Sequence, residues 1–326
     1  MIKINFFGTN EFAKTILEGL IKSSDFEIAT VFTMPDRPVG RKQVLQKSPV
    51  KILAEENGLK IEQPENLKNY SLLSAPYSLN IVCDYGIIIP KEILETPENG
   101  SINIHPSLLP LYRGASPIQS VLINGEKETG ISIMLMDEKM DHGPVLAQKT
   151  FDINPNDTYN ELHSKLALEA QILLNKTILK WVDNEIKPME QSHTEATFCK
   201  EFKKEDGKIN WNASALEIYN QYRGMINWPG VFTTLNGKRL KLIEIDILRD
   251  ITTNDDEENL RDPCLPDRQA STPVGMTTVQ ENKIFVSCGD GNLIEILELQ
   301  LEGKTQMNAK TFLNGNKDLD RTFLSS

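Results

Sequence analysis

Three side chains suited to stabilising a developing negative charge lie in two short stretches of the chain. Asn103 and His105 are two residues apart in the run SINIH, and Asp141 follows the run GISIMLM. Residues two apart on a strand leave from the same face, so the amide and the imidazole stand side by side. Both can donate hydrogen bonds to an oxyanion, and a carboxylate near His105 would fix its tautomer and charge. The pattern is typical of acyl transfer.

By itself an Asn-x-His pair is more often structural, so its surroundings decide the interpretation. The segment HPSLLP follows directly, and its prolines predict an irregular loop at the carboxyl edge of the strand, where open α/β sheets bind ligands. His105 and Asp141 lie 36 residues apart (141 minus 105), about one βαβ unit. Neighbouring strands are therefore expected to bring them together.

The elements that must position these residues alternate between short apolar runs and amphipathic segments up to about residue 185, which predicts an α/β domain with a largely parallel sheet. The expected strands are Ile2 to Phe7, Ile28 to Thr33, Leu79 to Cys83, Ser101 to His105 and Gly130 to Met136. The expected helices are Glu11 to Lys22, Pro49 to Asn57, Pro117 to Asn124 and Tyr159 to Val182.

The carboxyl-terminal part differs in texture. Residues 189–206 are polar and charged and are expected to form a linker after a catalytic domain of residues 1–188. Short β-like runs separated by turn signals then predict a smaller β-rich domain over residues 207–326, a barrel in outline. The acidic stretch of residues 250–272 is expected to form a loop.

The composition, 39% hydrophobic and 25% charged residues over 326 positions, is that of a two-domain globular protein. A net charge of -11 argues against non-specific coating of nucleic acid, because that binding depends on neutralising phosphates. One segment, PDRPVGRKQVLQKSPVK, is locally basic: it holds five basic residues and one acid, Asp36. Arg37, Arg41 and Lys42 are its candidate nucleic-acid contacts.

Other features limit the location and the cofactors. The amino terminus has no secretory leader, and no apolar run reaches the roughly 20 residues of a membrane span, so we expect a cytoplasmic protein without a membrane partner. The four cysteines and four histidines lack metal-ligand spacing, so no metal is expected. The turn GTNEF has one glycine where a dinucleotide fold has GxGxxG, so a nicotinamide cofactor is not indicated.

The stretches INIHPSLLPLYRGASPI and TGISIMLMDEKMDHGPVL together resemble the shared core of the folate-dependent formyltransferases. Further similarity extends nearly from end to end, through FFGTNEFA, YGIIIP, KEDGKINW, INWPGVFTTLNGK and SCGDGNLIEILELQLEGKTQM. Within that superfamily the chain is most similar to the branch that acts on initiator methionyl-tRNA. Asn10, Asp84 and His142 depart from the residues usual in that branch, and we expect them to alter packing without abolishing activity.

The resemblance implies a Rossmann-like catalytic domain, a smaller OB-like carboxyl-terminal barrel, and 10-formyltetrahydrofolate as the formyl donor. It implies catalysis by Asn103, His105 and Asp141, transfer to the α-amino group of methionine on initiator tRNA, and a monomeric enzyme. The folate contacts that it implies are Ser107, Leu108, Leu109, Pro110, Tyr85, Gly86, Ile87 and Ile88. The tRNA contacts that it implies, in the basic segment, are Arg37, Arg41 and Lys42. The basic residues Lys238, Arg239 and Lys241 of the predicted barrel are further candidate tRNA contacts.

Three other functions remain open from the residues alone. A formyltransferase of the same fold that acts on a small amine, such as a sugar nucleotide or glycinamide ribonucleotide, would keep Asn103, His105 and Asp141 but needs no basic loop. A hydrolase that releases the formyl group as formate needs no acceptor. A non-catalytic RNA-binding protein would use Lys238, Arg239 and Lys241 to follow phosphates, although the same residues equally suit a solvated hairpin strand.

Overall fold

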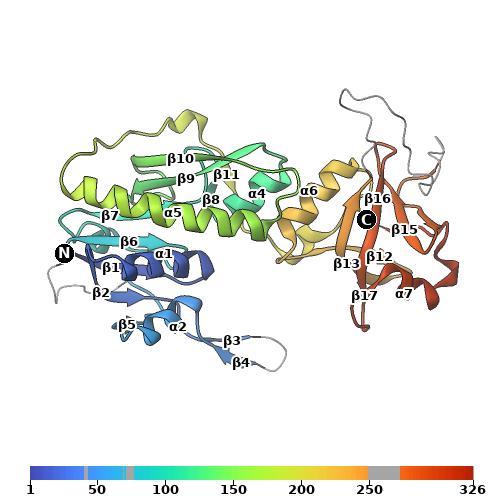
Figure 1. Cartoon of the computed structure of the whole chain (residues 1–326), viewed down its shortest axis with the longest axis horizontal. Coiled ribbons are helices and arrows are strands. Elements are labelled where there is room, and N and C mark those ends of the chain that lie inside the picture. Colours follow the sequence, from blue (N-terminus) through green and yellow to red (C-terminus); the bar gives the residue numbers. More distant parts are fainter. Residues whose placement is uncertain (40–42, 69, 71–76, 249–271, 326) are drawn as a thin grey trace. The chain divides into compact units, whose positions relative to one another are not determined.

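The computed structural model describes residues 1–39, 43–68, 70, 77–248 and 272–325, and the chain forms two compact units (Figure 1). The first consists of Met1–Ile118, Lys127–Pro155 and Asn160–Lys200. The second is built mainly from Glu201–Ser326 and takes up two short segments of the amino-terminal half, Gln119–Glu126 and Asn156–Tyr159.

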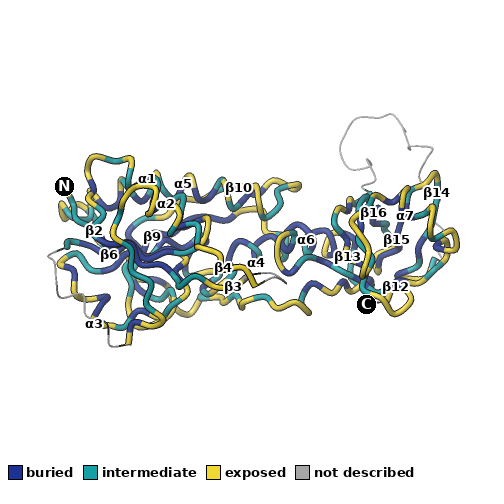
Figure 2. Tube along the Cα trace, turned by 90° about the horizontal axis from the view of Figure 1, so that it is seen from below, coloured by how far each residue is buried: buried dark blue, intermediate teal, exposed yellow. Residues whose placement is uncertain are grey.

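A seven-stranded sheet, in the order β10-β9-β7-β6-β1-β2-β5, forms the centre of the first unit. Its middle strands are buried on both faces, as their continuous apolar runs require (Figure 2). The bounds are β1 (Ile2–Gly8), β2 (Phe26–Phe32), β5 (Ile61–Glu62), β6 (Leu79–Cys83), β7 (Ser101–His105), β9 (Glu128–Leu135) and β10 (Val145–Asp152).

The expected largely parallel sheet is found for β7, β6, β1, β2 and β5. The last two strands differ. β9 runs antiparallel to β7, with His105 beside Ser132 and Ile102 beside Leu135, and β10 runs antiparallel to β9. The prediction of a βαβ unit between His105 and Asp141 is therefore wrong. β9 enters the sheet beside the end of β7 and runs back along it, whereas a βαβ unit requires the two strands to be parallel.

Two helices, α1 (Glu11–Lys22) and α5 (Tyr159–Val182), lie on one face of this sheet (Figure 1) and have the predicted bounds. Apolar residues recur at every fourth position of α5, including Leu162, Leu166 and Ala170, and all three are buried. This spacing forms a single stripe along the helix, which packs toward the sheet. The shorter helices of the unit are α2 (Pro49–Glu56) and α3 (Lys91–Leu94).

Two small strand pairs add to the first unit. β3 (Arg37–Val39) pairs antiparallel with β4 (Val44–Gln46), which makes a hairpin of the basic segment. β8 (Arg113–Gly114) pairs with β11 (Phe198–Cys199), so part of the polar segment expected to form a linker lies against the loop that follows β7.

A sheet in the order β12-β13-β16-β15-β14 dominates the second unit, with β17 beside β16. The chain's last residues bridge its two outer strands, because Ser325 pairs with Thr234 and Phe323 pairs with Met276. This closes the sheet into the β-rich domain predicted from sequence. The bounds are β12 (Val231–Leu235), β13 (Lys238–Ile247), β14 (Thr277–Gln280), β15 (Lys283–Ser287), β16 (Leu293–Leu301) and β17 (Met307–Asn308).

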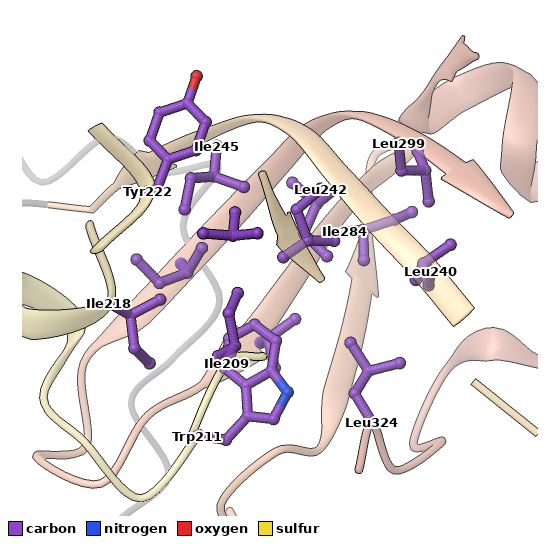
Figure 3. Packing of buried hydrophobic residues seen from close by; sticks show 14 of the residues in the cluster. Ile209, Trp211, Ile218, Tyr222, Leu240, Leu242, Ile245, Ile284, Leu299 and Leu324 are labelled. Atoms are coloured by element: carbon purple, nitrogen blue, oxygen red, sulfur yellow. The ribbon is translucent and has the colours of Figure 1, made fainter. Parts of the chain in front are cut away.

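The interior of this domain is apolar: Trp211, Leu240, Leu242 and Ile284 meet at its centre (Figure 3). Helices α6 (Ala215–Met225) and α7 (Ala309–Asn314) belong to the same unit, as does helix α4 (Pro117–Ile123) from Gln119 on. Helix α6 begins with a capping box in which Ser214 and Glu217 satisfy one another's backbone N–H groups. The sequence patterns did not predict α6 and α7.

Candidate active site

Asn103 and His105 lie on one face of β7, as alternation predicts, and Asp141 comes from the loop between β9 and β10. One carboxylate oxygen, Oδ1 of Asp141, lies 3.4 Å from Asn103 Nδ2 and 3.7 Å from His105 Nδ1. The structure thus brings the three predicted residues together. Because β9 is antiparallel to β7, the Asp141 loop leaves the sheet beside Ile102 and folds back over the strand to reach His105.

The imidazole of His105 is buried between two acceptors. Its Nε2 lies 2.8 Å from the carbonyl oxygen of Tyr112, which can only accept, so Nε2 carries the proton in this contact. Its Nδ1 faces Asp141 across the longer 3.7 Å distance. Catalytic hydrogen bonds are often long without substrate and tighten when it binds. The Nδ1 side of the ring is therefore the side that a substrate can engage.

The second oxygen of Asp141, Oδ2, accepts a 2.8 Å hydrogen bond from the backbone N–H of Gly114. Gly114 has a φ of +116°, and a Cβ there would lie 2.2 Å from the carbonyl oxygen of Cys199. Only glycine allows the two segments to approach this closely. The carboxylate is thus held on one side by a backbone donor while its other oxygen faces Asn103 and His105.

The predicted folate segment, Ser107 to Pro110, is fixed by two polar side chains of the antiparallel strands. The hydroxyl of Ser132 accepts from the N–H of Leu109 at 3.0 Å and donates to the carbonyl of Ser107 at 2.7 Å. Gln148 donates to the carbonyl of Leu109 at 2.8 Å. The side chain of Leu109 is buried, whereas Leu108 and Pro110 are half-buried.

The other predicted folate residues, Tyr85 to Ile88, do not share one orientation. Tyr85 packs edge-on against Phe7 in the core, and burial raises the pKa of its hydroxyl. Its backbone carbonyl accepts a 2.8 Å hydrogen bond from Thr9. Ile87 is partly buried, Gly86 is exposed, and the side chain of Ile88 is 91% exposed. This segment therefore offers its backbone and Ile88, but not the Tyr85 ring, to a ligand.

Of the predicted tRNA contacts, Arg37 lies exposed on β3, whereas Arg41 and Lys42 lie outside the described residues. Two other bases of the segment already have acidic partners: Lys47 Nζ lies 2.7 Å from Glu55, and Lys51 Nζ lies 2.7 Å from Asp36. The excess of four positive charges counted along the sequence already includes Asp36, so of these two pairs it is the one between Lys47 and Glu55 that reduces it further within the fold.

The three predicted tRNA residues of the second unit do not form one stripe. Arg239 and Lys241 alternate with the buried Leu240 on β13 and share the outer face of the sheet. The guanidinium of Arg239 lies 3.6 Å from the ring centre of Phe232. Lys238 begins the strand on the alternate side, so strand alternation separates it from the other two.

Two of the departures from the family pattern are in contact. Asp84 has a φ of +47° just after β6, and a hydrogen bond from Asn10 joins the two side chains. Desolvation of its carboxyl raises the pKa of Asp84, and the hydrogen bond from Asn10 and the charge of His163 oppose that shift. The pair ties the turn after β1 to the segment that begins at Tyr85.

Sequence reasoning missed a group of side chains behind the Asp141 loop. Gln191 donates to the carbonyls of Asp141 and Gly143, at 3.0 and 2.7 Å, and accepts from Arg113 at 2.7 Å. Arg113 comes shortly after the HPSLLP segment, and that proximity was a usable signal. Gln191 lies in the polar segment taken for a linker, where no periodicity marks it.

No group of three or more His, Cys, Asp or Glu side chains that could hold a metal ion occurs within the part of the chain that the structure describes. In that same part, none of the helices combines the length and apolar character needed to span a bilayer.

The chain as a whole has relatives among known proteins. Residues 2–178 match the family model of the formyl transferases, and residues 201–317 match that of the formyl transferase carboxyl-terminal domain. The chain is 43% identical to the methionyl-tRNA formyltransferase of Caldicellulosiruptor saccharolyticus, over 96% of this chain and 97% of that protein. It is 41% identical to the enzyme of that name from Thermodesulfovibrio yellowstonii, over 96% of each chain.

Among solved structures, the chain resembles the N-formyltransferase of Helicobacter canadensis in complex with folinic acid and dTDP-3-aminofucose. The TM-score is 0.64 at 22% identity, over 91% of this chain and 99% of that one. At this identity the likeness shows a shared fold alone.

Proposed function

Because the chain belongs to the methionyl-tRNA formyltransferases, we propose that Asn103, His105 and Asp141 catalyse its reaction, the formylation of methionine on tRNA. In our proposal the donor is 10-formyltetrahydrofolate and the acceptor is the α-amino group of initiator methionyl-tRNA. The product, N-formylmethionyl-tRNA, serves translation initiation, and we place the enzyme in the cytoplasm as a monomer.

The observation that carries the catalytic assignment is the convergence of Asn103 Nδ2 and His105 Nδ1 on one oxygen of Asp141, at 3.4 and 3.7 Å. Both contacts are too long to hold the donors firmly. The amide can therefore turn toward a formyl oxygen. His105 Nδ1 can donate to that oxygen when the ring is protonated, while Nε2 stays bonded to the Tyr112 carbonyl. Removing one such donor in related chemistry costs about 3 to 4 kcal/mol, or about 10² to 10³ in rate.

The nucleophile needs little activation. A free α-amino group has a pKa of about 8, so part of it is already unprotonated at neutral pH. When bound, 10-formyltetrahydrofolate supplies the formyl carbon, and its N10 takes up a proton as it leaves. Asn103 donates to the formyl oxygen as its negative charge develops. His105 donates from its ring, and Asp141 keeps that ring oriented and stabilises its protonated form. The amine loses one proton and the leaving nitrogen gains one, so protons balance.

Two segments near these residues support a folate site. The Ser107–Pro110 segment is held by Ser132 and Gln148, which are cross-strand neighbours on β9 and β10, as a preorganised ligand loop must be. The exposed Ile88 offers apolar surface. We propose that Ser107, Leu108, Leu109 and Pro110, with the backbone of Tyr85 to Ile87 and the side chain of Ile88, bind the folate.

We further propose that the tRNA contacts come from both units. Arg37, with Arg41 and Lys42, would meet phosphates of the acceptor stem, and Arg239 and Lys241 present a second pair of charges on the outer face of β13. Lys238 joins them only if the tRNA reaches the end of the strand. Contacts of this kind fix orientation without reading bases.

A direct assay tests the function. The protein is incubated with 10-formyltetrahydrofolate and either charged initiator or charged elongator methionine tRNA, and formyl-methionine is quantified. Formation of the product on the initiator tRNA is expected. Formyl transfer only to a dTDP-amino sugar, to glycinamide ribonucleotide or to water would place the chain in one of the rival classes.

A further inference from the structure

The backbone of the catalytic loop has to be held in an uncommon conformation. Asp141 has a φ of +50°, in the left-handed region that non-glycine residues rarely adopt. Gly143 is pressed against β9, since a Cβ there would lie 2.1 Å from the carbonyl oxygen of Leu135. A loop of this shape leaves carbonyl groups without partners in a strand or helix, and buried carbonyls require donors from elsewhere.

Gln191 supplies those donors. Its Nε2 lies 3.0 Å from the carbonyl oxygen of Asp141 and 2.7 Å from that of Gly143. Its side chain is buried, with only 7% of the residue exposed. The residue reaches this position because the chain around it runs along the site: Met189 pairs with Val145 at the start of β10.

Arg113 determines which end of the Gln191 amide faces the loop. Its Nη2 and Nε lie 2.7 and 3.2 Å from Gln191 Oε1, and a guanidinium can only donate. The amide oxygen must therefore point to Arg113, which turns both amide hydrogens to the loop carbonyls. With 3% of its surface exposed, Arg113 is itself buried and has little freedom to leave.

The same dipeptide also holds the other side of Asp141. Gly114, the neighbour of Arg113, donates its backbone N–H to Asp141 Oδ2 at 2.8 Å. The pair Arg113–Gly114 therefore fixes the side chain of Asp141 directly and its backbone through Gln191. Together these contacts orient Asp141 so that its other oxygen, Oδ1, faces Asn103 and His105.

The Arg113 side chain ends on a histidine pair. Its Nη2 lies 3.0 Å from Nδ1 of His193, which must be an unprotonated acceptor in that contact. The ring of His193 stacks on that of His142, with ring centres 4.0 Å apart and planes 7° apart, and His142 Nδ1 lies 2.6 Å from Asp137. A series of side-chain contacts therefore runs from the buried Arg113 to the exposed residues His193 and Asp137.

We propose that Gln191 and Arg113 are positioning residues for formyl transfer, which set the orientation of Asp141 without touching either substrate. This inference rests on the proposed function, since it assigns Asp141 a part in the chemistry. A misplacement of about 1 Å in a catalytic group can cost about 10²-fold in rate. A loop that loses its two amide donors is expected to move by at least that much.

The test variant is Gln191→Glu. Its carboxylate still accepts from Arg113, so the buried guanidinium keeps a partner, but it presents oxygen instead of N–H to the two carbonyls. The matched control is Gln221→Glu in the second unit, because Gln221 likewise donates to two carbonyls, those of Asp206 and Lys208, at 2.8 and 3.2 Å. Formylation kinetics and thermal melting are measured for both proteins beside wild type.

The expected result is a loss of about 10-fold or more in kcat for Gln191→Glu, with KM for the charged tRNA within about 2-fold of wild type. Gln221→Glu should keep its kcat even if its melting temperature falls equally. A Gln191→Glu enzyme with kcat within about 2-fold of wild type, or a loss matched by Gln221→Glu, would overturn the proposal.

If Gln191→Glu does not fold, Gln191→Asn takes its place. Its amide is one methylene too short to meet Arg113 and both carbonyls, so the same loss of kcat is expected, and unchanged kcat again overturns the proposal. Failure of the wild-type enzyme to formylate methionyl-tRNA would instead remove the proposed function, so the two failures are distinguishable.

Discussion

The Asp141 loop and the hairpin of β3 and β4 both carry charged side chains. The two regions differ in how far those side chains are buried and hydrogen-bonded. Around Asp141, polar groups are buried and held from several sides, by Gly114, Gln191 and Arg113. On the hairpin, Arg37 is exposed and so are its apolar neighbours, with Val44 63% and Leu45 69% exposed.

The difference follows from what each surface is proposed to do. A group that stabilises a developing charge acts best when its dipoles are already aligned, because no reorganisation is then needed during the reaction. A group that neutralises phosphate can stay hydrated until the nucleic acid arrives, and its contribution comes from released counterions. Changes at the Asp141 loop should therefore affect the chemical step, and changes at the hairpin should affect tRNA binding and its salt dependence.

The largest effect is expected from the three residues that meet at Asp141 Oδ1. Asn103→Ala, His105→Ala and Asp141→Ala should each lower kcat at least about 10²-fold, because each removes or disorients a donor to the formyl oxygen. Melting temperatures should change little. Steady-state kinetics at saturating tRNA measure this, and a His105→Ala enzyme with near-normal turnover would remove the catalytic role.

A smaller effect is expected from crowding the loop's support. Gly114→Ala places a Cβ against the carbonyl of Cys199, so the N–H that holds Asp141 must shift, and kcat should fall about 10-fold. The control is Gly303→Ala, where φ is +77° and nothing lies within 4 Å of the added Cβ. That variant carries only the left-handed strain, about 1 to 2 kcal/mol of stability, and should keep its kcat.

Equal losses of kcat in the two glycine variants would show that strain alone, and not the position of Asp141, explains the effect. Melting curves of both proteins provide the necessary comparison of stability.

The hairpin prediction concerns binding. Arg37→Ala, and the pair Arg41→Ala with Lys42→Ala, should lower kcat/KM for charged tRNA and reduce its salt slope by about 1 for each phosphate that is no longer neutralised. Affinity for a folate analogue should not change. An unaltered slope with unaltered tRNA efficiency would mean that the basic residues only offset an acidic surface, and weakened folate affinity would mean that they support the pocket.

The smallest effect is a pH dependence at His193. Desolvation, with the charges of His142, Arg113 and Lys139, lowers the pKa of this ring below its ordinary value of 6.5, and Glu190 opposes the shift. The unfolded chain then binds the proton first as pH falls. The stability that the neutral ring contributes is therefore complete above pH 6.5 and is lost as pH falls through the lowered pKa.

In the His193→Ala protein this contribution is missing at every pH. The gap between its melting temperature and that of wild type should accordingly be wider near pH 7.5 than near pH 5.5, roughly one unit either side of the ordinary histidine pKa. A gap that widens toward acid would contradict the neutral acceptor role of His193 toward Arg113.

Much of the first unit could be predicted from sequence, because local patterns there agree with burial. The four-residue spacing of Leu162, Leu166 and Ala170 defines a helix whose one apolar face is covered by the sheet, and alternation in SINIH places Asn103 with His105. The antiparallel turn of β9 could not be predicted, because it depends on the edge at which the chain re-enters the sheet.

Closure of the sheet in the second unit could not be predicted, because it depends on contacts between residues far apart in the sequence. Thr234 hydrogen-bonds with Ser325, 91 positions away (325 minus 234), and the local sequence around either residue does not predict this pairing. The same holds for Gln191, whose function arises only where the folded chain brings it behind the Asp141 loop. Charge counts along the basic segment missed the partner of Lys47, because Glu55 lies outside that segment, on helix α2.

Chemistry and tRNA binding should be separable between the two regions, and one experiment tests this directly. Single-turnover formylation of initiator methionyl-tRNA is measured across a salt series for wild type, His105→Ala and Arg37→Ala. We predict that His105→Ala lowers the rate at saturating enzyme at least about 10²-fold with an unchanged salt slope of binding, while Arg37→Ala reduces the slope by about 1 with an unchanged saturating rate. Rate and slope that move together in either variant would contradict this separation.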